Sequence, residues 1–244
     1  MTSSVVFDTC AKRIVSLGSV AGTWAVPYLA NHRLRLLKDL EILEEYALPV
    51  KSRVVEVGSS PPFLTVAMKS LGYDVVGLDL KPERFAEVCL SEDLEIRKID
   101  IEFDRFPFES NSVDVVMMNE VFEHLRFPVS TVSEVNRILK PGGILLLSTP
   151  NLRSFRGILN LVLRGKGWAV GADPAKEHRE PETIGHMGHV REYTAVEVGG
   201  FLKSFGLKPI RVIHRGHLGP LPERLLYRAV PWARPFMTVV ACRE

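Results

Sequence analysis

Apolar and polar residues alternate in blocks along most of this chain, and the blocks have the lengths of strands and helices. Four short apolar runs have the character of strands buried in a parallel sheet; they are residues 54–57, 75–79, 113–118 and 144–147. Segments with helical spacing of apolar residues lie between them, at 62–71, 82–90 and 129–139. Strands that alternate with helices at this spacing predict an α/β fold. We expect a doubly wound, mostly parallel sheet with helices on both faces.

The pattern is weaker toward both ends. Residues 1–32 show no clear periodicity, whereas 31–46 predict an amphipathic helix that ends before Pro49. We predict the remaining elements as strands at 94–100, 210–214 and 237–242, a sharp turn at 140–143, a helix at 195–205 that Thr194 and Glu197 cap, and a loop with one or two helical turns at 216–235. This divides the chain into an N-terminal helical segment (1–48), an α/β core (49–151), an insertion that forms a lid (152–194) and a C-terminal part of the same α/β domain (195–244).

Polar or glycine residues stand where the predicted core strands end. Gly58 follows the first strand and opens a turn into a helix, an arrangement that brings backbone close to a bound nucleotide. Asp79 ends the second strand, 21 residues later, which is the spacing of the carboxylate that accepts hydrogen bonds from ribose hydroxyls. Asp100 and Asn119 end the next two strands. Because ligands bind at the carboxyl ends of strands in open α/β sheets, the sequence predicts a nucleotide-type pocket there.

Composition excludes several broad classes. The 244 residues are 46% hydrophobic and 25% charged with a net charge of +2, so no overall charge favours nucleic acid. Cys10, Cys89 and Cys242 are far apart and odd in number, which argues against a disulfide framework and favours a reducing cytoplasm. No apolar run reaches the roughly 18 residues of a membrane-spanning helix. The weak apolar stretch after Lys12 and Arg13 is interrupted by glycine and proline, unlike a signal peptide.

Longer motifs carry a family resemblance over residues 53–151. Residues 113–125 (VDVVMMNEVFEHL), 135–143 (VNRILKPGG) and 148–151 (STPN) are similar to the core of the class I S-adenosylmethionine-dependent methyltransferases. The branch that the chain resembles is the small-molecule enzymes of the quinone-biosynthesis type. The resemblance implies a seven-stranded sheet in which the last strand runs antiparallel.

The resemblance also implies roles for individual residues. Glu56, Gly58 and Ser60 would shape the pocket beside the methionine part of S-adenosylmethionine. Asp79 would bind its ribose, and Leu80 would pack on its adenine. Asp100 and Ile101 would hold and flank the adenine, while Asn119 and Glu120 would line the floor near the sulfonium. The chain departs from the family where Ser60 and Pro62 replace the usual glycines of the turn. This departure keeps a non-catalytic, cofactor-binding or scaffold relative as an alternative.

Two histidines are the candidates for catalysis. His124 follows the fourth strand, and His189 precedes a Tyr-Thr helix start in a way that relatives share. Histidine can remove a proton from an acceptor hydroxyl near neutral pH. His178, His186 and His189 stand among Glu177, Glu180 and Glu182, but their spacing matches no recognised ligand pattern, so we expect no metal site.

Residues 152–168 have one apolar helical face flanked by arginines. This pattern is typical of a basic amphipathic helix at the acceptor site or on an anionic membrane, or of an ordinary helix packed on the domain.

The sequence therefore favours an S-adenosylmethionine-dependent methyltransferase, with S-adenosylhomocysteine as the product. We expect O-methylation of a small or lipid- or sugar-linked hydroxylated acceptor, in the cytoplasm or peripherally on a membrane. N-methylation of a small molecule is an alternative. A nicotinamide-dependent oxidoreductase is disfavoured because the GxGxxG pattern is incomplete.

Overall fold

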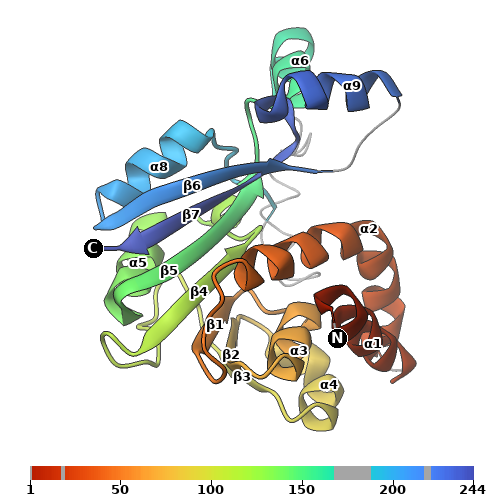
Figure 1. Ribbon diagram of the computed structural model, residues 1–244, viewed down its shortest axis with the longest axis vertical. Helices are drawn as coiled ribbons and strands as arrows, with labels where there is room; N and C mark the ends of the chain where they lie inside the picture. Colours follow the sequence, from red (N-terminus) through yellow and green to blue (C-terminus); the bar gives the residue numbers. More distant parts are fainter. Residues whose placement is uncertain (1, 18–19, 168–187, 217–220) are drawn as a thin grey trace.

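The computed structural model describes residues 2–17, 20–167, 188–216 and 221–244. At its centre is a seven-stranded sheet of order β3-β2-β1-β4-β5-β7-β6 (Figure 1). The strands are β1 (Arg53–Val57), β2 (Asp74–Asp79), β3 (Glu95–Lys98), β4 (Val113–Asn119), β5 (Leu139–Pro150), β6 (Leu207–Arg215) and β7 (Phe236–Arg243). β7 runs antiparallel to both β5 and β6, and the remaining neighbours pair in parallel. The predicted doubly wound sheet with an antiparallel last strand is confirmed.

Helices cover both faces of this sheet (Figure 1). The α-helices are α1 (Ser3–Ser16), α2 (Val20–Glu44), α3 (Phe63–Ser70), α4 (Ala86–Ser91), α5 (Pro128–Ile138), α6 (Phe155–Arg164), α8 (Ala195–Lys203) and α9 (Leu221–Ala229). Short 3₁₀ turns follow at Pro82–Phe85, Phe122–His124 and Pro231–Ala233. Thr194 and Glu197 form the predicted capping box at the start of α8.

Alternation along the central strands divides the core into two layers. Val54 of β1 faces the cluster that α1, α2 and α3 complete, with Phe7, Leu40 and Phe63 fully buried in it. Val55 faces the opposite cluster, which α5 and α8 complete. Because successive side chains of a strand point to opposite faces, a strand covered on both sides is apolar throughout. This explains why the core strands were recognisable as continuous apolar runs.

The chain ends differ most from prediction. Within residues 1–32, which have no clear pattern, residues 3–16 form α1 and residues 20–32 form the first half of α2, which runs through Pro27 without a break. The predicted helix at 31–46 therefore begins too late. The predicted turn at 140–143 lies within β5, which extends from Leu139 to Pro150, with Gly142 at φ 78°. The predicted strand at 94–100 shortens to the four residues of β3, and Asp100 lies just beyond it.

Candidate functional site

The glycine turn after β1 brings the backbone against the loop that follows β4. Gly58 has φ 75°, and a Cβ placed there would lie 2.5 Å from Val121 Cγ2. Both the left-handed backbone and the lack of space therefore require glycine at this position. The backbone N–H of Gly58 donates to the carbonyl of Leu78 on β2, at 2.8 Å. Ser60 is not among the residues with left-handed backbone, and the Ser60–Pro61 peptide is cis. Replacement of the family's second glycine by serine therefore imposes no left-handed strain on this turn.

Buried polar atoms without a protein partner gather beside this turn. The hydroxyl oxygen of Ser59 and both amide atoms of Asn119 are buried and have no hydrogen-bond partner among the described residues, whereas the side chain of Ser60 hydrogen-bonds to the carboxylate of Asp79. Ser59 and Ser60 follow β1, and Asn119 ends the neighbouring strand β4. Buried polar groups are nearly always hydrogen-bonded in folded proteins, so Ser59 and Asn119 are candidates to bind a polar ligand.

Two carboxyl groups flank the same turn. Burial raises the pKa of Glu56 to about 8, although Thr65 Oγ1 donates a hydrogen bond to it at 2.5 Å. Burial also raises the pKa of Asp79, whose Oδ1 accepts the backbone N–H of Lys81 at 2.8 Å. A carboxyl group at the end of β2 that is 9% exposed can accept hydrogen bonds from ligand hydroxyls.

Three further predicted residues lie at the same edge of the sheet. Asp100 follows β3 and accepts the backbone N–H of Glu102 at 3.0 Å, which fixes the loop. Ile101 packs partly buried against the core, whereas Leu80 is 40% exposed and presents an apolar surface beyond Asp79. The structure thus brings the predicted cofactor residues of β1, β2, β3 and β4 to one edge. Their roles in binding stay predictions.

A buried charge network, which the sequence did not predict, lies next to Glu120. Glu120 has φ 55° and accepts the hydroxyl of Ser148 at 2.9 Å. Arg35 Nη1 of α2 lies 3.4 Å from Glu120 Oε2, and Arg215 Nη2 of β6 lies 2.8 Å from Asp39 Oδ1. Burial raises the pKa of Asp39 to about 6, against the opposing influence of the two arginines. The one signal in the sequence was a pair of charges four residues apart on the apolar side of α2.

The two histidines predicted for catalysis meet at a buried carboxylate. The rings of His124 and His189 lie with centroids 4.6 Å apart at 64°, although 65 residues separate them. His189 Nε2 lies 3.9 Å from Glu123 Oε1, and Glu123 is fully buried. Burial raises the pKa of Glu123 well above its ordinary value, and the charge of Glu120 adds to this. The catalytic role of the histidines stays a prediction. The rest of the acidic histidine-rich segment, from Glu177 to His186, lies outside the described residues.

The carbonyl of Glu123 holds the returning chain in place. It accepts the backbone N–H of Val190 at 2.8 Å and that of Arg191 at 3.2 Å. Two residues on, Tyr193 packs against Phe122 with ring centroids 4.7 Å apart. These contacts seat His189 opposite His124 through backbone geometry that no sequence motif records.

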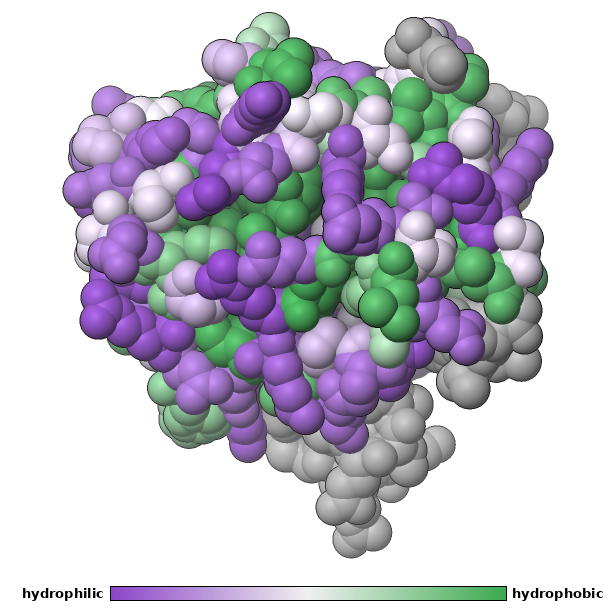
Figure 2. Space-filling view, turned by 90° about the horizontal axis from the view of Figure 1, so that it is seen from below, coloured by the Kyte–Doolittle hydropathy of each residue, from purple (hydrophilic) through white to green (hydrophobic). Residues whose placement is uncertain are grey.

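Helix α6 leaves its apolar face uncovered. Ser154 caps its start and Gly165 ends it with a left-handed residue. Its exposed large apolar side chains are 41–75% accessible; they are Phe155, Ile158, Leu159, Leu161, Val162 and Leu163. The predicted apolar face of residues 152–168 is therefore largely accessible in α6, and the role of this segment stays a prediction. In Figure 1, α6 and α9 project together at one end of the molecule, whereas hydrophilic side chains are spread over the opposite end (Figure 2).

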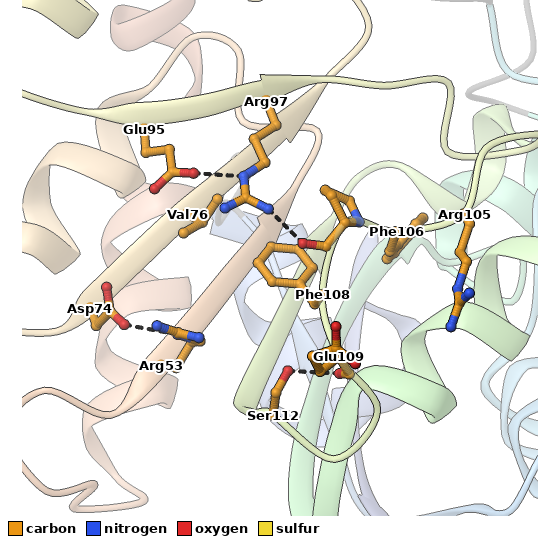
Figure 3. A pocket seen from close by; sticks show the side chains of 11 residues that line it. Arg53, Asp74, Val76, Glu95, Arg97, Arg105, Phe106, Phe108, Glu109 and Ser112 are labelled. Atoms are coloured by element: carbon orange, nitrogen blue, oxygen red, sulfur yellow. Dashed lines mark hydrogen bonds and ion pairs between the residues drawn. The ribbon is translucent and has the colours of Figure 1, made fainter.

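A groove of about 550 Å³ lies at the amino ends of the strands, away from these residues (Figure 3). Its charged side chains largely satisfy one another. Arg53 pairs with Asp74 at 2.8 Å, and Arg97 pairs with Glu95 at 2.6 Å and donates to the carbonyl of Pro107. Such mutual pairing leaves little charge for a ligand, so the carboxyl edge is the better candidate site.

Comparison with known proteins identifies relatives of this chain. The family model for a methyltransferase domain matches residues 55–147. The chain is 34% identical over 116 residues to a ubiquinone biosynthesis O-methyltransferase of Nitrosococcus oceani, covering 46% of this chain and 49% of that protein. With the protein of the same name from Methylococcus capsulatus, it shares 30% identity over 174 residues, or 68% and 71% of the two chains. The chain spans about half the length of the first of these relatives.

Among solved structures, the fold is similar to an S-adenosylmethionine-dependent methyltransferase of Thermotoga maritima, described as a possible histamine N-methyltransferase. The TM-score is 0.60 at 17% identity, and the match covers 92% of this chain and 98% of that one. At this identity the likeness concerns the fold, which is that of a Rossmann-like sheet with β7 inserted antiparallel. No helix among the described residues combines the length and apolar character needed to cross a bilayer.

Proposed function

This chain belongs to the class I S-adenosylmethionine-dependent methyltransferases, and on that premise we propose that it transfers a methyl group from S-adenosylmethionine to a hydroxyl of a small acceptor. One observation carries the proposal. The unpartnered buried atoms of Ser59 and Asn119 lie at the carboxyl edge of the sheet, and Glu123 and His124, which follow β4, lie close to His189. These observations support a polar ligand pocket and a proton-accepting cluster at the same edge of the sheet.

The buried polar atoms fit S-adenosylmethionine. Asp79 would accept the ribose hydroxyls, and Leu80 and Ile101 would pack on either side of the adenine. Asp100 would accept a hydrogen bond from the adenine amino group. Glu56, Gly58 and Ser60 would enclose the methionine end, and the amide of Asn119 and carboxylate of Glu120 would form the floor. Each assignment uses a donor, acceptor or apolar surface that is present at this edge.

The protein's part in the reaction is to position the acceptor and remove its proton. S-adenosylmethionine, when bound, supplies a methyl group on a positively charged sulfur. The protein must then hold the acceptor oxygen in line with that methyl group, exclude water and take the hydroxyl proton. His124 and His189 are the predicted groups for that proton. Relatives named as ubiquinone biosynthesis O-methyltransferases support a hydroxyl rather than an amine as the acceptor.

The setting of the reaction is a finer part of the proposal. The uncovered face of α6 carries no acidic residue and is flanked by Arg153, Arg156 and Arg164. Such a face is suited to lie on an anionic bilayer. We propose that this face makes peripheral contact with a membrane that carries a lipid-linked acceptor, in a protein whose cysteine usage favours the cytoplasm.

Calorimetric titration of the purified chain with S-adenosylmethionine and S-adenosylhomocysteine tests the first step. We expect micromolar binding of both. Incubation with a panel of phenols and catechols, and with the matching anilines, then tests the acceptor by mass spectrometry. Methylation of the phenols is the expected result, and methylation of anilines alone would favour the N-methyltransferase alternative. If neither cofactor form binds, the turn with Ser60 and Pro62 is disabled and the scaffold alternative replaces the enzyme.

A further inference from the structure

We propose that Arg153, His214 and Arg234 bind the phosphate group of a phosphorylated acceptor. This inference rests on the proposed function, because it names the class of acceptor that the enzyme would take. Arg153 follows β5, which ends at Pro150, His214 is the second-last residue of β6, and Arg234 precedes β7, which begins at Phe236. Since β7 lies between β5 and β6 and runs antiparallel to both, its start lies at the same edge as their ends. The three residues therefore share the carboxyl edge of the sheet.

A buried asparagine holds the two arginine-bearing loops together. Asn151 is 1% exposed, and its Nδ2 donates to the carbonyls of Trp232 and Arg234 at 2.9 Å and 2.8 Å. Its Oδ1 accepts the backbone N–H of Arg153 at 3.0 Å. The guanidinium of Arg153 lies over the ring of Trp232, 4.3 Å from the centroid. In Figure 1 this is where β5 continues toward α6 and the chain returns from α9 to β7. The fold itself thus keeps Arg153 and Arg234 close together.

The positive charges at this place lack acidic partners among the described residues. Within that part of the chain, neither Arg153 nor Arg234 forms an ion pair, and His214 Nδ1 is buried without a hydrogen-bond partner. Burial lowers the pKa of His214, and the charges of Arg153 and Arg234 lower it further. A phosphate would supply the missing negative charge and acceptor oxygens, because the N–H groups of arginine match phosphate geometry.

The phosphate site lies beside the predicted site of methyl transfer. The backbone N–H of Leu152 donates to the carbonyl of Tyr193 at 2.9 Å, four residues after His189. His124 follows β4, and β5, β7 and β6 lie beyond β4 in that order. Neighbouring strands are about 4.8 Å apart, so two strand spacings, roughly 10 Å, separate β4 from the middle of the three cations. The acceptor would therefore carry its phosphate at about this distance from the hydroxyl that is methylated.

Binding of a phosphorylated catechol tests the site without any cofactor. The probe is a catechol joined to phosphate by an octyl chain, and the alcohol that lacks the phosphate is its neutral counterpart. By calorimetry we expect the phosphate ester to bind at least about tenfold more tightly than the alcohol, since hydrogen bonds between charged groups contribute that much.

Substitutions locate that binding at the three residues. Arg153→Gln and Arg234→Gln should each weaken binding of the phosphate ester about tenfold or more, because each removes a charged donor. His214→Asn should weaken it about threefold, because it removes a neutral donor. Arg105→Gln is the matched control, since Arg105 is exposed beside the groove at the amino ends of the strands, and it should bind the ester as the parent does. Binding of S-adenosylhomocysteine by each variant shows that it is folded.

Three outcomes would overturn the proposal. The first is equal affinity of the parent for the phosphate ester and the alcohol. The second is an equal loss in Arg105→Gln and Arg234→Gln, because net charge would then explain the binding. The third is that the soluble ester does not bind, whereas vesicles with phosphatidic acid bind the parent and not Arg234→Gln. In that case the cations hold the head group of a membrane lipid and not the acceptor.

Methyl transfer separates this proposal from the proposed function. With S-adenosylmethionine present, Arg234→Gln should raise KM for the phosphate ester and leave kcat unchanged, because the lost interaction binds ground state and transition state alike. Equal methylation of the ester and the alcohol by the parent would refute the phosphate site and leave the methyltransferase. Binding of the ester without any binding of S-adenosylmethionine would refute the methyltransferase and leave the phosphate site.

Discussion

The two halves of the proposed active site are built in different ways. The cofactor half follows four consecutive strand ends, and its residues lie within one stretch of chain from Glu56 to Glu120. The acceptor half joins α2, the loop after β4, the segment around His189 and the end of β6, so its contacts cross up to 180 residues. Both halves contain buried polar atoms without a hydrogen-bond partner among the described residues, in Ser59 and Asn119 of the first and in Arg35, Asp39 and Arg215 of the second, and the second also holds the ion pairs Arg35–Glu120 and Arg215–Asp39. The first half is thus assembled from one stretch of chain, and the second from segments that are far apart in the sequence.

The strongest test of this comparison is Arg215→Met. Arg215 is 5% exposed, pairs with Asp39 and donates to the carbonyl of Arg35 at 3.1 Å. Its loss leaves Asp39 buried without its closest cation, so we expect the free energy of unfolding to fall by about 3–5 kcal/mol. Urea unfolding measures it.

Arg211→Met is the matched control, because Arg211 lies on the same strand but pairs with Glu45 at the surface. Arg211→Met should lower the free energy of unfolding much less than Arg215→Met does. The double variant Asp39→Asn with Arg215→Met should recover part of the loss, since it removes both charges. If Arg215→Met lowers the free energy of unfolding no more than Arg211→Met does, the buried charge network does not stabilise the acceptor half.

Asp79→Ala tests the cofactor half. Loss of the carboxylate that accepts the ribose hydroxyls should weaken binding of S-adenosylhomocysteine by about 2–3 kcal/mol, or roughly 30- to 150-fold. Calorimetry measures it. Asp74→Ala, at the exposed start of the same strand, should leave the affinity unchanged. Equal effects of the two variants would argue against the pocket.

These contrasts also explain what could be predicted from sequence. β1, β2 and β4 are buried on both faces, so they stand out as apolar runs, and Asp79 and Asn119 follow directly from their ends. The start of α2 could not be predicted, because Pro27 interrupts a pattern that tertiary packing then stabilises as one helix.

The acceptor half was beyond prediction for another reason. His124 and His189 were both candidates, but nothing local says that Glu123 lies close to His189, since its carbonyl accepts hydrogen bonds from Val190 and Arg191, which are far away in the sequence. Arg35 and Asp39 look like surface charges until β6 brings Arg215 beside them. Contacts between distant segments leave no periodic signal in the chain.

Stability as a function of pH tests the burial of the Glu56 carboxyl group, which lies on β1 just before the glycine turn. The pKa of Glu56 rises from an ordinary 4.5 to about 8 in the folded chain. The folded state therefore binds this proton more tightly, so its contribution to stability is complete below about pH 4.5 and is lost as the pH rises toward 8. Glu56→Gln lacks this titration. Between pH 6 and 8 the variant should gain about 2 kcal/mol of unfolding free energy relative to the parent. Parallel curves in urea unfolding would show that Glu56 is not buried as a neutral acid.

The smallest effect concerns the membrane. Val162 and Leu163 of α6 are 75% and 71% exposed, and insertion of such side chains into a bilayer contributes favourably on top of the attraction of the arginines to anionic lipid. Changing both to Glu should weaken binding to phosphatidylglycerol vesicles in a flotation assay about fivefold, or near 1 kcal/mol, with cofactor affinity unaltered. Val196→Glu on α8 alters a side chain that is 79% exposed but lies outside the basic helix. This variant should therefore bind the vesicles as the parent does. If both variants lose binding equally, net charge explains the result. If neither variant loses vesicle binding, the apolar face of α6 contacts a protein surface and not a lipid bilayer.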